Sequence, residues 1–149
     1  MYNDTITLFN LYPSKLGDVW YPTVIHNVYL LVDRAAIIAK YGTDSKDSAA
    51  LHIKYERKYD GIYIAGKKYL TPKEWDRQTN DTLADTITFT GGANHDFFIE
   101  GEHSDGNPIS DADEVDTLYQ RMNKLYDNCF KISSVAKYSV IPHFEIMGA

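Results

Sequence analysis

Histidine, carboxylate and cysteine side chains could do chemistry in this chain, but their spacing carries no catalytic or metal-binding signature. The five histidines are His26, His52, His95, His103 and His143. None follows the HExxH spacing, which places two metal ligands on one face of a helix. His95 with Asp96, or His103 with Asp105, could contribute to a site, but both pairs lie in turn-rich sequence. We therefore expect solvated loop histidines and no bound metal.

Four acids cluster where a helix is expected to begin: Asp111, Asp113, Glu114 and Asp116. Acids in a first turn cap free backbone amides and favour the helix dipole, so they need no acid–base role. The sequence has no GxSxG motif, no Walker A loop and no local Cys–His signature, and Gly91-Gly92 is typical of a hairpin turn. These patterns predict a protein that is not an enzyme and binds no cofactor.

Aromatic side chains offer a different chemistry, a stacking platform for a sugar ring. Trp20, Tyr21, Trp75 and the other tyrosines could build one, which makes a carbohydrate-binding module an alternative hypothesis. Their spacing follows no signature, however, and tyrosine also suits sheet faces and interfaces. Cys129 is the single cysteine, so it forms no internal disulfide. We expect it to be a small buried hydrophobe in a protein of a reducing compartment.

Length and composition indicate one ordinary globular domain. The chain has 149 residues, of which 44% are hydrophobic and 24% charged. The formal net charge of −6 argues against a protein that grips nucleic acid by its phosphates. No apolar run approaches the roughly 20 residues of a membrane helix, so we expect no membrane partner.

The elements that must position these side chains are mostly strands. Alternation and β-branched runs predict strands at 5–11, 23–32, 51–55, 61–65 with 68–70, 86–90 with 97–102, 130–132 and 138–146. In the last of these, every second residue is apolar from Tyr138 to Ile146, and residues 133–137 are expected to be the preceding turn. Pro142 cannot donate a backbone hydrogen bond, which predicts a sheet edge or a bulge there.

Two helices are expected. Thr71, Pro72 and Glu74 form a capping-box pattern that predicts a short helix through about residue 78. Residues 111–127 are expected to form one long amphipathic helix. Its apolar stripe comprises Val115, Leu118, Tyr119, Met122, Leu125 and Tyr126. The predicted fold class is therefore mainly β (α+β), a small β-barrel or sandwich-like single domain over 1–149 with one long amphipathic helix and one short helix.

Several segments, in order along the chain, resemble those of small minor capsid proteins of tailed bacteriophages. The segments are TITLFN at 5–10, WYPTVI at 20–25, DSAALHI at 47–53, KYLTPKEW at 68–75, TITFT at 86–90, FFIEG at 97–101, ISSV at 132–135 and HFEI at 143–146. The family is that of the head-closure (stopper or head–tail connector) proteins. The longer acidic helix, Phe144 at a position where tryptophan is common, and the turn at 91–96 depart from its pattern.

The resemblance implies a β-barrel-like fold without catalysis. It also implies a homo-oligomeric ring, expected to be a dodecamer that matches the portal, between an adaptor ring and the tail-terminator proteins. DNA would be held in and later passed through the channel without sequence-specific binding. The protein would be assembled in the bacterial host cytoplasm and reside in the virion at the head–tail junction. A tail-terminator or tail-tube subunit is the alternative structural role.

The resemblance also bears on the region before the third predicted strand. It favours a strand at 35–41, which the residues alone leave open between strand and helix, paired with 49–57. The intervening loop at 42–48 has no large apolar side chain to fix its conformation. Its candidate channel residues are Thr43, Asp44, Ser45, Lys46 and Asp47. In stopper proteins such a projection reaches the ring lumen, while a plain solvated turn is the other interpretation of this loop.

Overall fold

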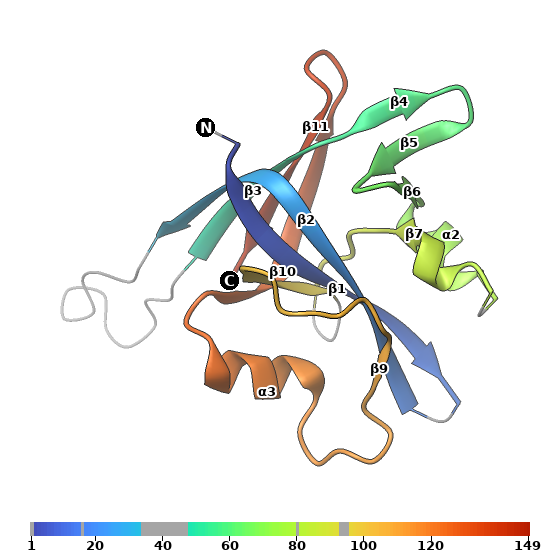
Figure 1. Cartoon of the computed structure of the whole chain (residues 1–149), viewed down its shortest axis with the longest axis vertical. Helices are drawn as coiled ribbons and strands as arrows, with labels where there is room; N and C mark the ends of the chain where they lie inside the picture. Colours follow the sequence, from blue (N-terminus) through green and yellow to red (C-terminus); the bar gives the residue numbers. More distant parts are fainter. Residues whose placement is uncertain (1, 16, 34–47, 80, 93–95) are drawn as a thin grey trace.

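Six antiparallel strands close into a β-barrel (Figure 1). The structure is a computed structural model that describes residues 2–15, 17–33, 48–79, 81–92 and 96–149. The barrel strands are β1 (Asp4–Ser14), β2 (Gly17–Asp33), β3 (Ser48–Lys54), β8 (Phe97–Glu100), β10 (Cys129–Tyr138) and β11 (His143–Gly148). They pair in the order β1-β8-β10-β11-β3-β2, and β1 pairs again with β2 to close the barrel. The prediction of a mainly β, barrel-like fold is confirmed.

Strand β2 belongs to two walls of the barrel because it bends at a bulge. Its first part pairs with β1, and residues from Tyr29 to Asp33 pair with β3. The β1–β2 register shifts between Asp4 and Ile6, opposite His26 and Asn27. Asn27 has a φ of 58°, a left-handed conformation that asparagine tolerates better than most residues. Such a bulge increases the local twist and turns the strand around the barrel corner.

Two hydrophobic clusters share the strand β1. One fills the barrel interior and includes Ile6, Leu8, Leu51, Phe98 and Phe144. The other lies outside the wall, where Phe9, Leu11, Trp20, Phe97, Ile99 and Cys129 pack against Leu118 of the helix α3 (Leu118–Leu125). Covering on both faces explains why residues 6–11 of β1 are all buried.

A smaller sheet adjoins the barrel. It contains β4 (Glu56–Lys58), β5 (Gly61–Ile64), β6 (Lys67–Tyr69) and β7 (Thr86–Ile87). The predicted hairpin around Gly66 is confirmed as β5 and β6. The predicted pairing of 86–90 with 97–102 is wrong, because β7 pairs in parallel with β6 while β8 pairs with β1 and β10. Hydrophobic alternation alone does not specify which strand becomes the neighbour.

The short helix α2 (Pro72–Asp76) follows β6 and has the predicted capping box. The Thr71 side chain accepts from the Glu74 amide, and the Glu74 carboxylate accepts from the Thr71 amide. A 3₁₀ turn (Leu83–Asp85) then leads into β7. Among the described residues, no helix is long and apolar enough to cross a membrane.

The expected long helix at 111–127 is wrong, because α3 spans only Leu118–Leu125. Residues before it form β9 (Ile109–Ser110), which pairs with β2, and a run of turns. Asp111 explains the difference, since its carboxylate accepts from Trp20 Nε1 at 2.6 Å and from the Leu118 amide at 3.0 Å. These bonds tie Asp111 to the barrel, and the helix begins only at the Thr117 cap. Val115 is consequently 102% exposed.

The C-terminal strands also differ from the prediction. Residues 133–137, expected as a turn, continue β10, and the turn instead falls at 139–142. Pro142 therefore lies in the turn and not on a sheet edge, and β11 is an inner barrel strand between β10 and β3. The apolar alternation was misleading because Tyr138 and Val140 face solvent. The expected strand at 35–41 lies outside the described residues, and β3 pairs with β2 and β11.

Candidate functional site

The outer face of β3 and β11 brings together one group of side chains with metal-ligand chemistry, the only one among the described residues. His143 and Glu145 are two positions apart on β11, so they project from the same face of the strand. The register pairs Glu145 with His52 of β3. One ligand atom from each of the three residues lies within 4.8 Å of the others. We call His52, His143 and Glu145 the His–Glu cluster.

Hydrogen bonds orient the His–Glu cluster. His143 Nδ1 lies 2.6 Å from the Ile141 carbonyl oxygen, and Nε2 lies 3.2 Å from Glu145 Oε1. His52 Nδ1 is 3.7 Å from the same oxygen. The bond from His143 is the largest cause that lowers the pKa of Glu145, and Tyr138 also hydrogen-bonds to this carboxylate. The carboxylate is therefore the common partner of three rings.

Aromatic rings flank the His–Glu cluster on both sides. The Tyr138 ring stacks on His143 with centroids 4.8 Å apart and planes 7° apart. The Tyr29 ring meets His52 edge-on at 5.6 Å, and the two imidazole rings lie 5.8 Å apart with planes 4° apart. These contacts limit the movement of both histidines although all three cluster side chains are partly exposed, by 14% for His143, 29% for His52 and 37% for Glu145.

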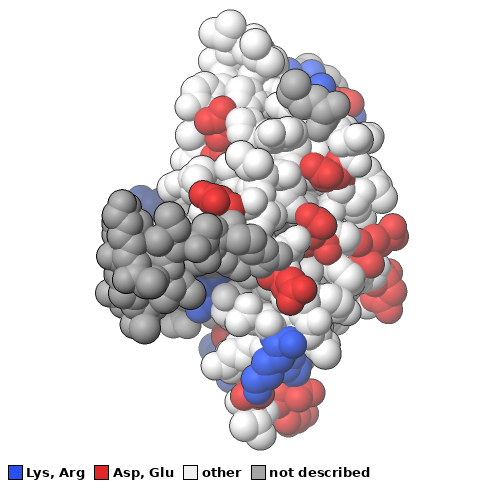
Figure 2. Space-filling view, turned by 90° about the vertical axis from the view of Figure 1, so that its left-hand side faces the viewer, with Lys and Arg blue, Asp and Glu red and all other residues white. Residues whose placement is uncertain are grey.

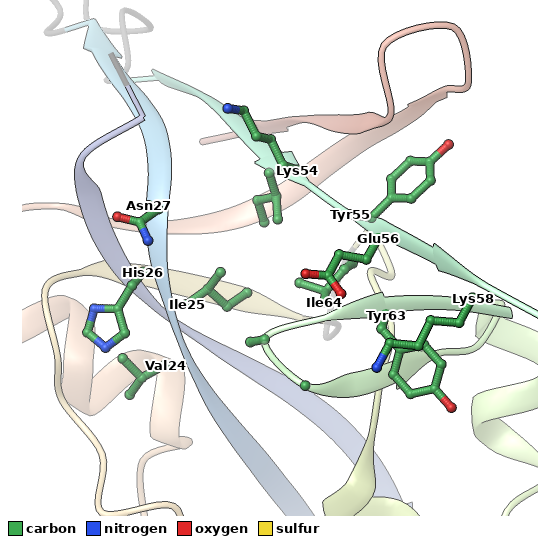
Figure 3. A pocket seen from close by; sticks show the side chains of 13 residues that line it. Val24, Ile25, His26, Asn27, Lys54, Tyr55, Glu56, Lys58, Tyr63 and Ile64 are labelled. Carbon is green, nitrogen blue, oxygen red and sulfur yellow. The ribbon is translucent and has the colours of Figure 1, made fainter.

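A groove of about 700 Å³ lies between β2 and the β5–β6 hairpin (Figure 3). Its apolar floor includes Ile25, Ile53 and Ile64, each at most 3% exposed. Charged side chains from β3 and β4 stand around it, namely Lys54, Glu56 and Lys58. The Lys58 ammonium lies over the Tyr63 ring, 4.4 Å from the centroid. The groove therefore combines an apolar floor with charges of both signs around it.

Asp96 is buried, whereas the sequence suggested a solvated loop residue. Its carboxylate accepts from the Leu11 amide at 2.8 Å, from Asn10 Nδ2 at 2.8 Å and from the Thr90 amide at 2.9 Å. Burial raises the pKa of Asp96 to about 7, against the opposing effect of these hydrogen bonds. The site joins β1 to the segment after β7, which gives Asp96 a structural role. His95 lies outside the described residues.

The other residues singled out from the sequence have structural surroundings. Trp20 and Trp75 are 3% and 1% exposed, so they cannot form the exposed platform that a carbohydrate-binding module requires. Cys129 is a free, buried thiol whose pKa burial raises to about 12, as expected for a small hydrophobe. His103 packs against the Tyr126 ring at 4.2 Å. The candidate channel residues Thr43–Asp47 lie outside the described residues.

Sequence reasoning missed the His–Glu cluster. His52, His143 and Glu145 alternate with apolar residues in the predicted strands 51–55 and 138–146, but alternation carries no information on which strands pair. His52 and His143 are far apart in the chain, and only the β3–β11 register brings them together. A pattern of two histidines and a glutamate, each flanked by apolar strand residues, was the only available signal.

The fold and these features define a small closed-barrel β protein with an outer His–Glu cluster and an open groove. The chain belongs to DUF6751, a family of unknown function, whose model matches residues 1–149. No curated protein and no solved structure matches the chain.

Proposed function

We propose that this protein is a virion structural subunit of the head–tail connector of a tailed bacteriophage. Copies would form a ring between the portal-side adaptor and the tail, and the ring would retain DNA and later pass it. Two findings support the proposal. The ordered series of segments resembles the head-closure proteins, and the closed six-stranded barrel agrees with the fold that this resemblance implies.

The observation that carries the proposal is the β10–β11 hairpin, which projects beyond the rest of the barrel (Figure 1). Its end exposes three large apolar side chains: Tyr138 by 45%, Val140 by 97% and Ile141 by 71%. A projecting tip of this kind is costly to leave in water and is typical of a surface that another protein covers. In a cyclic ring, each copy would present this tip to a different surface of its neighbour.

The charge distribution agrees with a channel through which DNA slides. Acidic side chains are spread over the face of the molecule in Figure 2, and the whole chain carries a net charge of −6. Phosphate contacts by lysine and arginine would hold DNA in place, because they dominate protein–DNA affinity. An acidic wall avoids this retention.

A deletion of the gene in the host phage tests the proposal. Negative-stain images should show DNA-filled or emptied heads that are not attached to tails, and the wild-type gene supplied in trans should restore complete particles. Normal tailed particles from the deletion would contradict the proposal. A tail-tube subunit is the alternative, and long stacked tubes formed by the purified protein alone would favour it over a connector.

The proposed channel loop has its own test. Residues 43–47 would place Asp44 and Asp47 beside DNA, with Lys46 partly offsetting them. Replacement of 43–47 by two glycines should leave the melting temperature nearly unchanged, because the loop has no large apolar side chain to bury. A gating loop predicts rings that form but leak DNA before tails attach. Full DNA retention would identify the segment as a plain turn.

A further inference from the structure

We propose that the His–Glu cluster is a binding site for a first-row divalent transition metal ion of the zinc type. This inference does not depend on the head–tail role. Two imidazoles and one carboxylate are a donor set that suits Zn²⁺, with the fourth tetrahedral position open to water. The partial exposure of all three side chains is compatible with such an open position.

The hydrogen bonds of His143 carry the argument. The Ile141 carbonyl can only accept, so His143 Nδ1 must hold the proton that it donates over 2.6 Å. In the neutral ring, Nε2 then has a lone pair, and it faces the Glu145 carboxylate at 3.2 Å. Two electron-rich atoms at this distance need a proton or a cation between them. A metal-bound histidine commonly donates its other ring N–H to a backbone carbonyl in this way.

The position of His52 favours a bound cation over a proton between His143 Nε2 and the Glu145 carboxylate. A proton on His143 Nε2 would satisfy one nitrogen–oxygen pair and leave His52 Nδ1 at 3.7 Å from the carboxylate, beyond hydrogen-bond distance. A metal ion is bound by all three groups at once. Ligand atoms of a tetrahedral zinc site lie about 3.4 Å apart, given bonds of about 2.0–2.2 Å. The two nitrogen–oxygen distances, 3.2 Å and 3.7 Å, are already close to this value, whereas the two imidazole nitrogens must approach each other from within 4.8 Å.

The surroundings provide the support that metal ligands usually have. Tyr138 hydrogen-bonds to Glu145 and stacks on His143, while Tyr29 contacts His52 edge-on. The two imidazole planes are nearly parallel, so a shared ion requires one ring to turn about its Cβ–Cγ bond. That torsion has a broad potential in histidine, so the ring can turn with little change in energy. The bound ion would join β3 to the end of β11 that follows the 139–142 turn.

Calorimetric titration of the purified full chain with ZnCl₂ tests the site, with thermal unfolding as a second measurement. We expect one Zn²⁺ per chain and a melting temperature that rises with Zn²⁺ concentration. His52→Ala, His143→Ala and Glu145→Gln should each weaken Zn²⁺ binding by at least about tenfold. The control is His26→Ala, which removes an exposed histidine of β2 and should keep the wild-type affinity.

Absence of Zn²⁺ binding by the wild type would overturn the proposal. So would cluster variants that bind as tightly as the wild type, because the metal would then bind elsewhere. Should His143→Ala fail to fold, Glu145→Gln still decides the question, because it keeps the size of the side chain. In the zinc-free protein at mildly alkaline pH, ¹⁵N NMR should show the His143 proton on Nδ1. A neutral ring protonated on Nε2 would contradict the proposed ligand geometry.

Discussion

Asp96 is an acid with almost no access to water, since it is 1% exposed. The hydrogen bonds that its carboxylate accepts from Asn10, Leu11 and Thr90 favour the charged form, whereas burial favours the neutral form. Burial prevails enough to raise the pKa to about 7. The protonation of this one residue therefore links the stability of the barrel to pH near neutrality.

The direction of this dependence follows from two pKa values of Asp96, the ordinary value of 3.8 in the unfolded chain and about 7 in the folded protein. Between about pH 4 and pH 7, the unfolded chain releases a proton that the folded protein keeps on Asp96. The contribution of Asp96 to the free energy of unfolding therefore falls as pH rises through this window and is constant above it. The full change is on the order of 4 kcal/mol, since one pKa unit corresponds to about 1.4 kcal/mol.

Urea unfolding of the wild type and of Asp96→Asn between pH 4.5 and 8 measures this effect. The difference in unfolding free energy, wild type minus variant, should fall with rising pH and level off above pH 7. Asp105→Asn is the control, because hydrogen bonds within its exposed turn lower the pKa of Asp105 and place its titration below this range. A flat difference for Asp96→Asn would show that the carboxyl group is already ionised throughout.

At the scale of elements, α3 has one fully buried side chain. Leu118 is 1% exposed and packs in the outer cluster with Phe97, whereas Val115 is fully exposed before the helix. Leu118→Ala should lower the unfolding free energy by about 2–5 kcal/mol, because it leaves a cavity. Val115→Ala should change it by less than about 0.5 kcal/mol. Denaturant titrations decide, and equal effects of the two substitutions would contradict the register of α3.

Substitutions at the tip of the β10–β11 hairpin should impair ring assembly without impairing folding. Val140→Ser with Ile141→Ser removes exposed apolar groups, so the melting temperature should change little. If the tip contacts a ring neighbour, the double variant should fail to form rings on the portal complex. Val115→Ser is the matched control, an equally exposed valine outside the hairpin. Normal ring formation by the double variant would exclude the tip as the ring contact.

At the scale of the whole molecule, the charge predicts weak affinity for DNA. A chain with a net charge of −6 and scattered acidic side chains neutralises few phosphates. The purified protein should therefore not retard double-stranded DNA in a gel at 50 mM salt. If the protein binds DNA and the logarithm of its affinity falls steeply with the logarithm of the salt concentration, it contacts several phosphates, about one for each 0.9 units of that slope. That result would contradict a channel wall that lets DNA slide.

The sequence by itself determined the local features of this protein. Period-two alternation in 51–55 predicted a strand with Leu51, Ile53 and Tyr55 inside, and all three are buried. The Thr71–Glu74 capping box was predicted and is present, because it depends on residues three positions apart. These features depend on neighbours along the chain. They sufficed to predict a mainly β, barrel-like fold.

Only the tertiary structure decided which distant residues meet. Asp111 ends up beside Trp20, and that contact shortens the expected helix. Tertiary pairing also places the turn of the last hairpin at 139–142, whereas the alternation predicted it at 133–137. It buries Asp96, which the composition predicted to lie in a solvated loop. His52 and Glu145 become neighbours through the β3–β11 register. Strand pairing is set by the closure of the whole barrel, which minimises exposed strand edges and exposed apolar surface. A pattern of neighbouring residues therefore does not predict which strands pair.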